Sequence, residues 1–265
     1  MHFTDFPPAG MPKSSGHDPA SVVIIDYGLG NVRSVANALQ ALGADVQLSR
    51  DPADFKDADG LILPGVGAFG DGMSNLRDLG LIPHLNELVL NQQKPFLGIC
   101  LGMQLMAKSS TEGGHAEGLG WLNADVVRFP ADLQDLQASD SGKSGLKVPH
   151  VGWNDVTVKR TCPVLGLPGA VHSYYFVHSY ILQCHDADLI AGSCEYGIEF
   201  PAVVQQNNIL GVQFHPEKSQ KHGLALLGNF LHLARNNRAN VLYPQMLPES
   251  SQGDSIQPTQ GERSC

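Results

Sequence analysis

The sequence contains no long apolar run. It has no stretch of about 18 consecutive apolar residues, and the first twenty residues, MHFTDFPPAGMPKSSGHDPA, lack the apolar core of a signal peptide. A membrane-spanning helix and a secretory leader are therefore not expected. We expect a soluble protein that is located in the cytoplasm.

Clusters of basic residues and closely spaced cysteines are also missing. The net charge is -9, and no run of lysine or arginine provides a surface for nucleic acid or for an anionic membrane. The five cysteines are odd in number and contain no C-x-x-C pair, which argues against a disulfide framework and against a zinc site. We expect neither a metal nor a cofactor, and small-molecule chemistry fits best.

The length and composition predict one domain with extensions. A chain of 265 residues with 42% hydrophobic residues can bury one substantial core. Both ends are rich in Pro, Gly, Ser and Gln and offer little to bury. We therefore expect a disordered extension over residues 1–20, a domain over 21–238 with a polar surface insertion at 131–147, and a flexible tail over 239–265.

Strands and helices alternate in the first half of this domain. The predicted strands are SVVIID (21–26), ADVQLS (44–49), GLILPGVG (60–67) and PFLGI (95–99); the predicted helices are 31–42 and a stretch near 74–92 that is interrupted at Pro83. This alternation is typical of an α/β fold, in which helices cover both faces of a mainly parallel sheet.

The second half is richer in strands. Residues 124–129, 156–158, 174–182, 199–206 and 208–214 are enriched in β-branched and aromatic residues and are separated by turn signals. A final helix is predicted near 220–236. We therefore expect additional strands beside the parallel sheet.

The stretch GICLGMQ (98–104) has the pattern of a nucleophile elbow. Cys100 lies between Gly98 and Gly102, after an apolar strand and before apolar residues at helical spacing. Glycines permit so tight a turn, and the start of a helix favours the thiolate form of the cysteine. The alternative is an inert core cysteine, since cysteine is among the most buried residue types.

A catalytic cysteine needs a base and an oxyanion site. In GVQFHPEKS, His215 ends a predicted strand, and Glu217 two residues later could orient its imidazole. The backbone N–H of Leu101 and the glycine-rich loop LPGVGAFG (63–70) could supply oxyanion donors. Taken alone, each motif also fits a purely structural role. The His215–Glu217 stretch could be a solvated strand edge, and the 63–70 loop could be an ordinary glycine turn.

Several other residues have simpler interpretations. Asn31 is expected to cap the helix that follows it. His150, His172 and His178 lack the helical H-x-x-x-H spacing of a zinc site and are expected in the core or at an interface. Trp153 is expected to contribute to packing or to an interface.

The motifs together resemble those of a known family. PGVGAFGDGM, GICLGMQ, VPHVGWN, YYFVHSY and GVQFHPEKS occur in this order and at these separations in class I, triad-type glutamine amidotransferases. Over residues 21–238, and through IDYGLGNVRSV near its start, the sequence is most similar to the glutaminase subunits of imidazole glycerol phosphate synthase. The resemblance implies a flavodoxin-like amidotransferase domain.

The resemblance also implies a role for individual residues. The family's triad falls on Cys100, His215 and Glu217. The resemblance places the oxyanion hole at Gly65, Val66, Gly67 and Leu101. It assigns glutamine binding to Gln104, Ser179 and Tyr180. It places Lys218 at the interface with the partner.

The implied activity is hydrolysis of glutamine to glutamate and ammonia through a cysteine thioester. The implied partner is a cyclase subunit with a TIM-barrel fold, which forms a heterodimer with the glutaminase and uses the ammonia to make imidazole glycerol phosphate and AICAR in histidine biosynthesis. Alternatives are an amidotransferase subunit for anthranilate or aminodeoxychorismate synthesis, a cysteine peptidase-like hydrolase, and an inactive scaffold. The PGVG and VPHVGWN motifs favour the histidine pathway over the first of these.

Overall fold

A computed structural model of the chain describes residues 19–131, 133 and 145–242. Most of the predicted extension at 1–20, of the insertion at 131–147 and of the tail at 239–265 lies outside these ranges. The last helix, α6, continues to Leu242, past the predicted helix end near 236.

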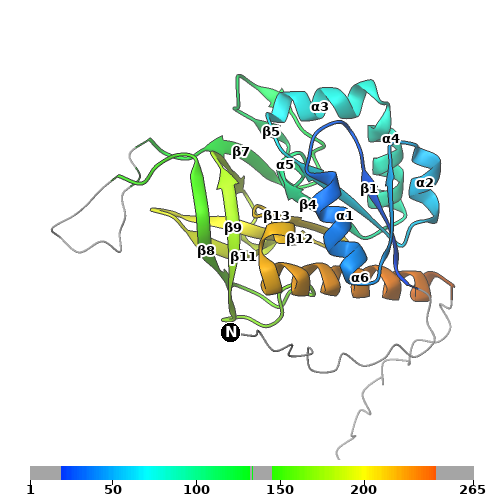
Figure 1. The fold of residues 1–265 in the computed structure, drawn as a ribbon. Coiled ribbons are helices and arrows are strands. Elements are labelled where there is room, and N and C mark those ends of the chain that lie inside the picture. The colour runs from blue at the N-terminus through cyan, green and yellow to red at the C-terminus, as the bar shows by residue number, and fades with distance from the viewer. Residues whose placement is uncertain (1–18, 132, 134–144, 243–265) are drawn as a thin grey trace, which may run out of the picture.

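A nine-stranded sheet forms the centre of the fold, in the order β2-β1-β3-β4-β13-β12-β11-β8-β9 (Figure 1). Its first five strands are parallel, as the alternating pattern predicts. They are β2 (Asp45–Ser49), β1 (Ser21–Ile25), β3 (Gly60–Gly65), β4 (Phe96–Cys100) and β13 (Ile209–Val212). The middle three are buried almost throughout, as expected for parallel strands with helices on both faces.

The other four strands of this sheet are antiparallel. They are β12 (Glu199–Gln206), β11 (Ile190–Glu195), β8 (His150–Val158) and β9 (Val171–His178). Sequence analysis predicts β12, β9 and the end of β8, but misses β11, in which Gly192 and Ser193 weaken the strand pattern.

A second, four-stranded sheet has the order β10-β7-β5-β6. Its strands are β10 (Tyr180–Cys184), β7 (Ala124–Arg128), β5 (Ser109–Ser110) and β6 (Ala116–Glu117). The segment predicted as one strand over 174–182 is divided at Ser179, so that β9 belongs to the large sheet and β10 to the small one.

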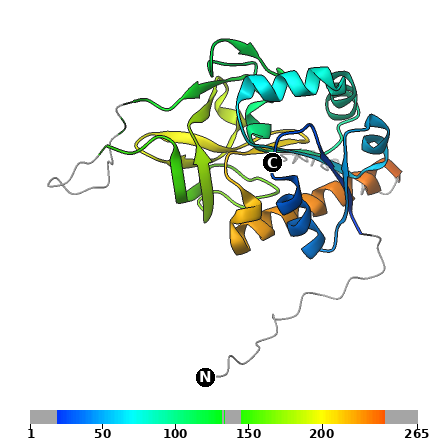
Figure 2. The ribbon, with the colours of Figure 1, turned by 45° about the horizontal axis from the view of Figure 1, so that its top comes forward.

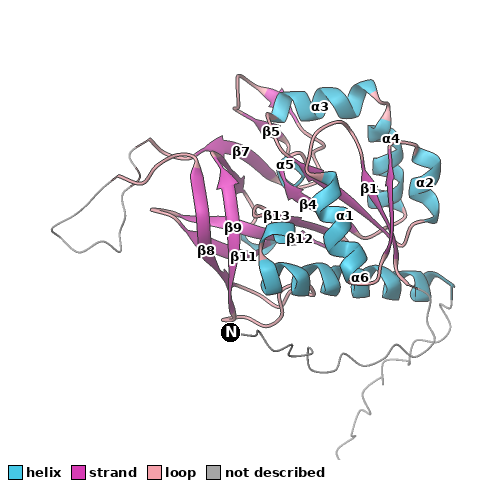
Figure 3. Cartoon of the chain, in the orientation of Figure 1, coloured by secondary structure: helices cyan, strands magenta, loops and turns pink. Residues whose placement is uncertain are grey.

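Helices cover both faces of the large sheet. Helices α1 (Val32–Ala41) and α6 (Gln220–Leu242) lie together on one face, and their apolar side chains share a core with Ile24 and Leu97. The other face carries α2 (Pro52–Asp57), α3 (Phe69–Asp78), α4 (Leu81–Asn86) and a π-helical turn (Glu87–Asn91). Figures 2 and 3 show the sheet between these two groups of helices.

Helix boundaries differ from the sequence prediction in the stretch near 74–92. The helical region begins at Phe69, and the interruption falls at Gly80, whose φ of 64° is left-handed, rather than at Pro83. Pro83 lies in the first turn of α4, where a missing N–H group costs no helical hydrogen bond. Asn31 does precede α1, but its side chain makes no capping hydrogen bond.

The helix after Cys100 is shorter than its apolar spacing suggests. Helix α5 spans only Leu101–Gln104. The next three carbonyl groups, of residues 105–107, accept hydrogen bonds from the N–H groups of residues 119–122 instead of continuing the helix. A loop that is distant in sequence therefore ends this helix, which local periodicity cannot reveal.

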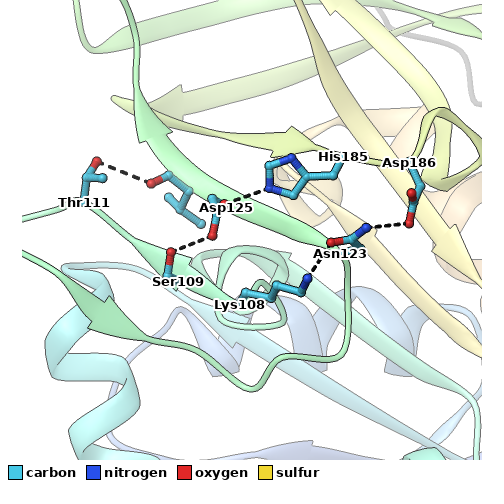
Figure 4. A network of polar contacts seen from close by, with 8 residues as sticks. Lys108, Ser109, Thr111, Asn123, Asp125, His185 and Asp186 are labelled. Atoms are coloured by element: carbon cyan, nitrogen blue, oxygen red, sulfur yellow. Dashed lines mark hydrogen bonds and ion pairs between the residues drawn. The ribbon is translucent and has the colours of Figure 1, made fainter.

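Polar side chains join the strands of the small sheet at its surface (Figure 4). Asp125 accepts hydrogen bonds from Ser109 Oγ at 2.6 Å and from His185 Nε2 at 2.8 Å, and these two bonds hold the pKa of the carboxyl below its ordinary value. Nearby, Asn123 bonds to Lys108 and Asp186. Because these side chains are partly or largely exposed, we infer that the network stabilises the local conformation of the small sheet and takes no part in catalysis.

Within the described ranges, no helix combines the length and the apolar character needed to cross a bilayer.

Candidate active site

A cavity of about 300 Å³ lies at the carboxyl ends of the parallel strands, the edge at which open α/β sheets bind ligands. Cys100 and His215 both line it. The remaining wall is formed by the loop after β3, the start of α5, the loop between β5 and β6, and the junction of β9 and β10; its residues are Val66, Gly67, Leu101, Gln104, Glu112, Val177, His178, Ser179 and Tyr180.

Cys100 has the backbone conformation of a nucleophile elbow. It is the last residue of β4, with φ 55° and ψ -109°, values that a residue with a side chain rarely adopts. A Cβ atom on Gly98 would lie 2.6 Å from the carbonyl oxygen of Gly102, and one on Gly102 would overlap the carbonyl oxygen of Leu63. Both glycines of the G-x-C-x-G pattern are thus required by backbone contacts, as the motif predicts.

His215 and Glu217 form a buried pair. Nδ1 of His215 lies 2.9 Å from Oε1 of Glu217, and the two side chains are 3% and 1% exposed. The backbone of His215 is fixed by hydrogen bonds to Tyr175 and Ser219. Since Nδ1 donates to the carboxylate, Nε2 is the nitrogen that can exchange a proton with the nucleophile and the substrate. It has no hydrogen-bond partner among the described residues.

The charges around His215 favour its protonated form. Burial opposes a charged imidazole, but interaction with the Cys100 thiolate and the Glu217 carboxylate outweighs it and raises the pKa of His215 to about 9. An imidazolium beside a thiolate is the resting state of a cysteine nucleophile that is activated by histidine. The arrangement can therefore attack an acyl carbon and then protonate the leaving group.

The glycine loop after β3 lies beside the elbow. Gly65 pairs with Cys100 across β3 and β4, and a Cβ atom there would overlap the Tyr27 hydroxyl and lie 2.7 Å from Cβ of Leu101. Val66 and Gly67 follow at the cavity wall, and Gly67 has a φ of 110°. Val66, Gly67 and Leu101 thus line the same cavity as Cys100, whereas Gly65, the last residue of β3, is not part of its wall.

The structure brings Gln104 together with the segment at Ser179 and Tyr180. Nε2 of Gln104 donates to the Tyr180 carbonyl at 3.0 Å and to Oε1 of Gln213 at 3.1 Å. The N–H of Phe129 donates to the Ser179 carbonyl at 3.0 Å. These bonds fix the irregular residue between β9 and β10 at the cavity wall.

Lys218 lies apart from the cavity wall. Its Nζ is 5.8 Å from the centroid of the Tyr175 ring, a cation–π contact. Trp153 is 46% exposed and meets the same ring edge-on at 6.2 Å. Trp153, expected in packing or at an interface, is therefore at the surface and shares the Tyr175 ring as a neighbour with Lys218.

Sequence analysis misses Glu112 and Gln213 in the site. Glu112 comes from the loop between β5 and β6, accepts a hydrogen bond from the N–H of Phe69 at 2.8 Å and lines the cavity. No local motif marks it. Gln213 donates from Nε2 to Sγ of Cys100 at 3.8 Å and is fully buried. The sequence clue to Gln213 is that it is the one polar residue in the apolar stretch GVQF.

His150 and His178 form a buried pair of neutral rings. His178 Nδ1 donates to the Tyr180 carbonyl at 2.9 Å, so its Nε2 must accept from His150 Nδ1 at 3.1 Å. Burial lowers the pKa of His178 to about 3 and that of His150 to about 4. His172 lies elsewhere, with Nε2 bonded to the Leu165 carbonyl. In the described ranges, no group of three or more metal-binding side chains is placed to hold an ion.

Fold and site together define a class of enzyme in which a cysteine on a strand-to-helix elbow works with a histidine and a carboxylate. A family model described as "Glutamine amidotransferase class-I" matches residues 23–234. The chain belongs to the class I glutamine amidotransferases.

Curated relatives specify the branch of this class. The chain is 45% identical over 216 residues to "Imidazole glycerol phosphate synthase subunit HisH" of Moorella thermoacetica, covering 81% of this chain and 96% of that protein. It is 43% identical over 212 residues to "Imidazole glycerol phosphate synthase subunit HisH 1" of Campylobacter jejuni, covering 80% and 100%. Within its class, the chain is a member of the HisH family.

Solved structures agree on the fold. A protein described as a glutamine amidotransferase superimposes with a TM-score of 0.60 at 21% identity, covering 81% of this chain and 98% of that one. PurLQS from Thermotoga maritima gives a TM-score of 0.62 at 17% identity, covering 83% and 99%. At such identities the likeness shows a shared fold.

The elbow contacts predict a contrast between two glycines. Gly102→Ala is expected to destabilise the fold by several kcal/mol, on the order of 3 or more, because the rigid Leu63 carbonyl occupies the place of the added methyl group. Gly70→Ala in α3 meets no atom within 4 Å and is expected to stabilise by about 0.5 to 1 kcal/mol. Urea unfolding of both variants measures this, and equal effects would contradict the steric account.

The buried histidines predict sensitivity to acid. His150 and His178 bind fewer protons when folded than when unfolded below their ordinary pKa of 6.5, so stability should fall as the pH falls from 6.5 toward 4. The raised pKa of His215 acts on the other side, and its contribution is lost as the pH rises from 6.5 through about 9. The urea midpoint should therefore be highest near pH 6.5.

His150→Phe tests the acid side of this profile. It removes one of the two groups that must take up a proton on unfolding, so the decline toward pH 4 should become shallower whatever the stability of the variant at neutral pH. An unchanged acid slope would show that other groups cause the decline.

Proposed function

We propose that this chain is the glutaminase subunit of imidazole glycerol phosphate synthase, and that it passes ammonia to a cyclase subunit. The observation that carries the proposal is the buried His215–Glu217 pair in one cavity with Cys100 on its elbow. Membership of the HisH family, over about four-fifths of the chain, supports the choice of pathway.

In the first half of the reaction, the Cys100 thiolate attacks the side-chain carboxamide carbon of glutamine. Negative charge develops on the carboxamide oxygen, and the N–H groups of Leu101 and of the loop at Gly65, Val66 and Gly67 are the nearby donors for it. His215, held by Glu217 and charged at neutral pH, protonates the leaving nitrogen, which departs as ammonia. A glutamyl thioester remains on Cys100.

In the second half, water hydrolyses the thioester. His215, neutral after giving its proton to ammonia, takes a proton from this water, which attacks the acyl carbon. The same oxyanion donors stabilise the second tetrahedral intermediate, and collapse releases glutamate with the sulfur as leaving group. The imidazolium and thiolate are restored, so the cycle needs no metal or redox partner.

The cavity suggests how the amino-acid end of glutamine binds. Of the residues described around it, Glu112 is the acidic one, and its carboxylate suits the substrate's α-ammonium group. Ser179 and Tyr180 offer backbone groups on the wall, and Gln104 holds that segment in place. We assign substrate binding to these four residues.

An exposed patch beside the cavity suits the cyclase partner. Val151 and Trp153 of β8 are 55% and 46% exposed and stand opposite Val177 and Tyr175 of β9. Val177 also lines the cavity, and Lys218 lies over Tyr175. A heterodimer formed through this patch would place the partner next to the point at which ammonia is released.

The proposal includes a location in the cytoplasm. The four described cysteines, Cys100, Cys162, Cys184 and Cys194, are all free thiols, as is usual in a reducing compartment.

The decisive experiment is glutamate release from glutamine, measured with the purified chain alone and then in the presence of its cyclase partner with the phosphoribulosyl-formimino carboxamide nucleotide. We expect strong activation by the pair and no activity in Cys100→Ala. Equal rates in both conditions would keep the triad chemistry but contradict the pathway. Absence of activity in both would contradict the glutaminase assignment.

Glu217→Gln tests the role of the carboxylate. We expect the rate to fall by roughly 100-fold or more, because the imidazole loses the group that orients it and raises its pKa. For the same reason, the alkaline limb of the pH profile should move to lower pH. Glu117→Gln, an exposed glutamate in β6, is the matched control and should change neither quantity.

Trp153→Ala tests the partner patch. The variant should keep its fold and lose most of the activation by the cyclase subunit, because large aromatic side chains contribute strongly to interfaces. Leu48→Ala is the control: this side chain is 43% exposed on β2, at the opposite edge of the sheet. The measurement is the rate of glutamine hydrolysis as the cyclase subunit is titrated into each variant. Equal activation of the two variants would contradict this placement of the interface.

A further inference from the structure

Gln213 is an uncharged polar side chain in the most buried part of the fold. It follows β13, between β4 and β12 in the sheet, and its exposed fraction is 0%. Its backbone N–H donates to the Ala202 carbonyl at 2.9 Å. A buried amide is costly unless its side-chain groups are hydrogen-bonded, so its partners indicate its role.

The orientation of this amide follows from its neighbours. The Tyr180 carbonyl can only accept, so the group of Gln104 that faces it must be the NH₂ group, at 3.0 Å. That same nitrogen reaches the side chain of Gln213 at 3.1 Å, which therefore presents its carbonyl oxygen. The NH₂ group of Gln213 is then left to face Sγ of Cys100, at 3.8 Å.

We propose that Gln213 is a positioning residue for the nucleophile: its amide donates a hydrogen bond to the Cys100 sulfur and connects it, through Gln104, to the segment at Ser179 and Tyr180. The inference rests on the proposed glutaminase function. It assigns Gln213 no contact with the substrate, since Gln213 is absent from the cavity wall.

The chemistry of a buried thiolate makes this bond useful. Cys100 is only 6% exposed, so few water molecules can solvate its negative charge. Hydrogen bonds to an ionised acceptor are roughly twice as strong as those between neutral groups. A donor fixed on the side of β13 stabilises the thiolate while leaving the cavity side of the sulfur open for glutamine.

The chain of amides also ties substrate binding to the nucleophile. Tyr180, Gln104, Gln213 and Cys100 are joined by three hydrogen bonds in series. Each amide can turn only if its neighbour gives up a bond. Residues assigned to substrate binding and the reactive sulfur therefore hold one another in a single arrangement.

Alkylation of the free chain by iodoacetamide tests the proposal without glutamine hydrolysis. The rate is measured against pH, with Cys100→Ala to identify the labelled site. In Gln213→Met, which keeps the length but removes the donor, the pH of half-maximal alkylation should rise by about one to two units. Gln206→Met is the control, since Gln206 bonds to the Trp121 carbonyl far from the sulfur, and its profile should match the wild type.

A second variant covers the case in which Gln213→Met does not fold. Gln213→Leu also removes the donor and is apolar like its surroundings, so it should raise the same midpoint. Circular dichroism and urea unfolding establish that each variant is folded. A folded variant of either kind with the wild-type midpoint would overturn the proposal.

Turnover in the complex with the cyclase subunit gives a further readout. Gln213→Met should lower kcat by roughly 10-fold or more with little change in KM, because the nucleophile is affected and the residues of the cavity wall remain. A rise in KM alone would overturn the positioning role. If the wild type shows the alkylation profile but no glutaminase activity, the assignment of Gln213 stands and the proposed function fails.

Discussion

The contact between the backbones of β3 and α5 is the constraint on which the site depends. Gly102 lies directly against the carbonyl of Leu63, and no side chain fits between them. This approach allows the chain to turn at once from β4 into α5 and leaves Cys100 with a positive φ at the sheet edge. The strain at Cys100 persists because the close-packed backbone around it leaves no alternative path.

The antiparallel part of the sheet completes a site that the parallel part begins. The parallel strands present the nucleophile at the end of β4 and the base just after β13, whereas the segment at Ser179 follows β9, an antiparallel strand. The N–H of His215 bonds to the Tyr175 carbonyl, which ties the base to β9. The catalytic and substrate-binding parts are thus fixed to one framework.

His150 and His178 differ from the catalytic histidine because of their partners. His215 faces a carboxylate and a thiolate, and its pKa rises to about 9 in spite of burial. His178 faces a neutral ring and a carbonyl, and burial lowers its pKa to about 3. At neutral pH, His215 is therefore protonated and His178 is neutral, so the proton is held by the residue that can donate it to the substrate.

Local sequence patterns predict the parallel strands and the elbow because their causes are local: apolar runs, and glycines at a turn. The length of α5, by contrast, is set by hydrogen bonds to residues 119–122, and the small sheet depends on pairing between distant segments. Glu112 reaches the cavity from a loop that carries no motif. Gln213 could have been noticed as a lone polar residue in GVQF, but its partner is visible only when β13 is placed beside β4.

The division of one extended segment between two sheets has a mechanical consequence. Residues 171–178 are hydrogen-bonded to β8 in the large sheet, and residues 180–184 to β7 in the small one, with Ser179 as the single residue between them. Neither sheet can rotate against the other without changing the backbone dihedral angles at this residue. Because Ser179 itself lines the cavity, a change in its backbone dihedral angles would change the shape of the cavity wall.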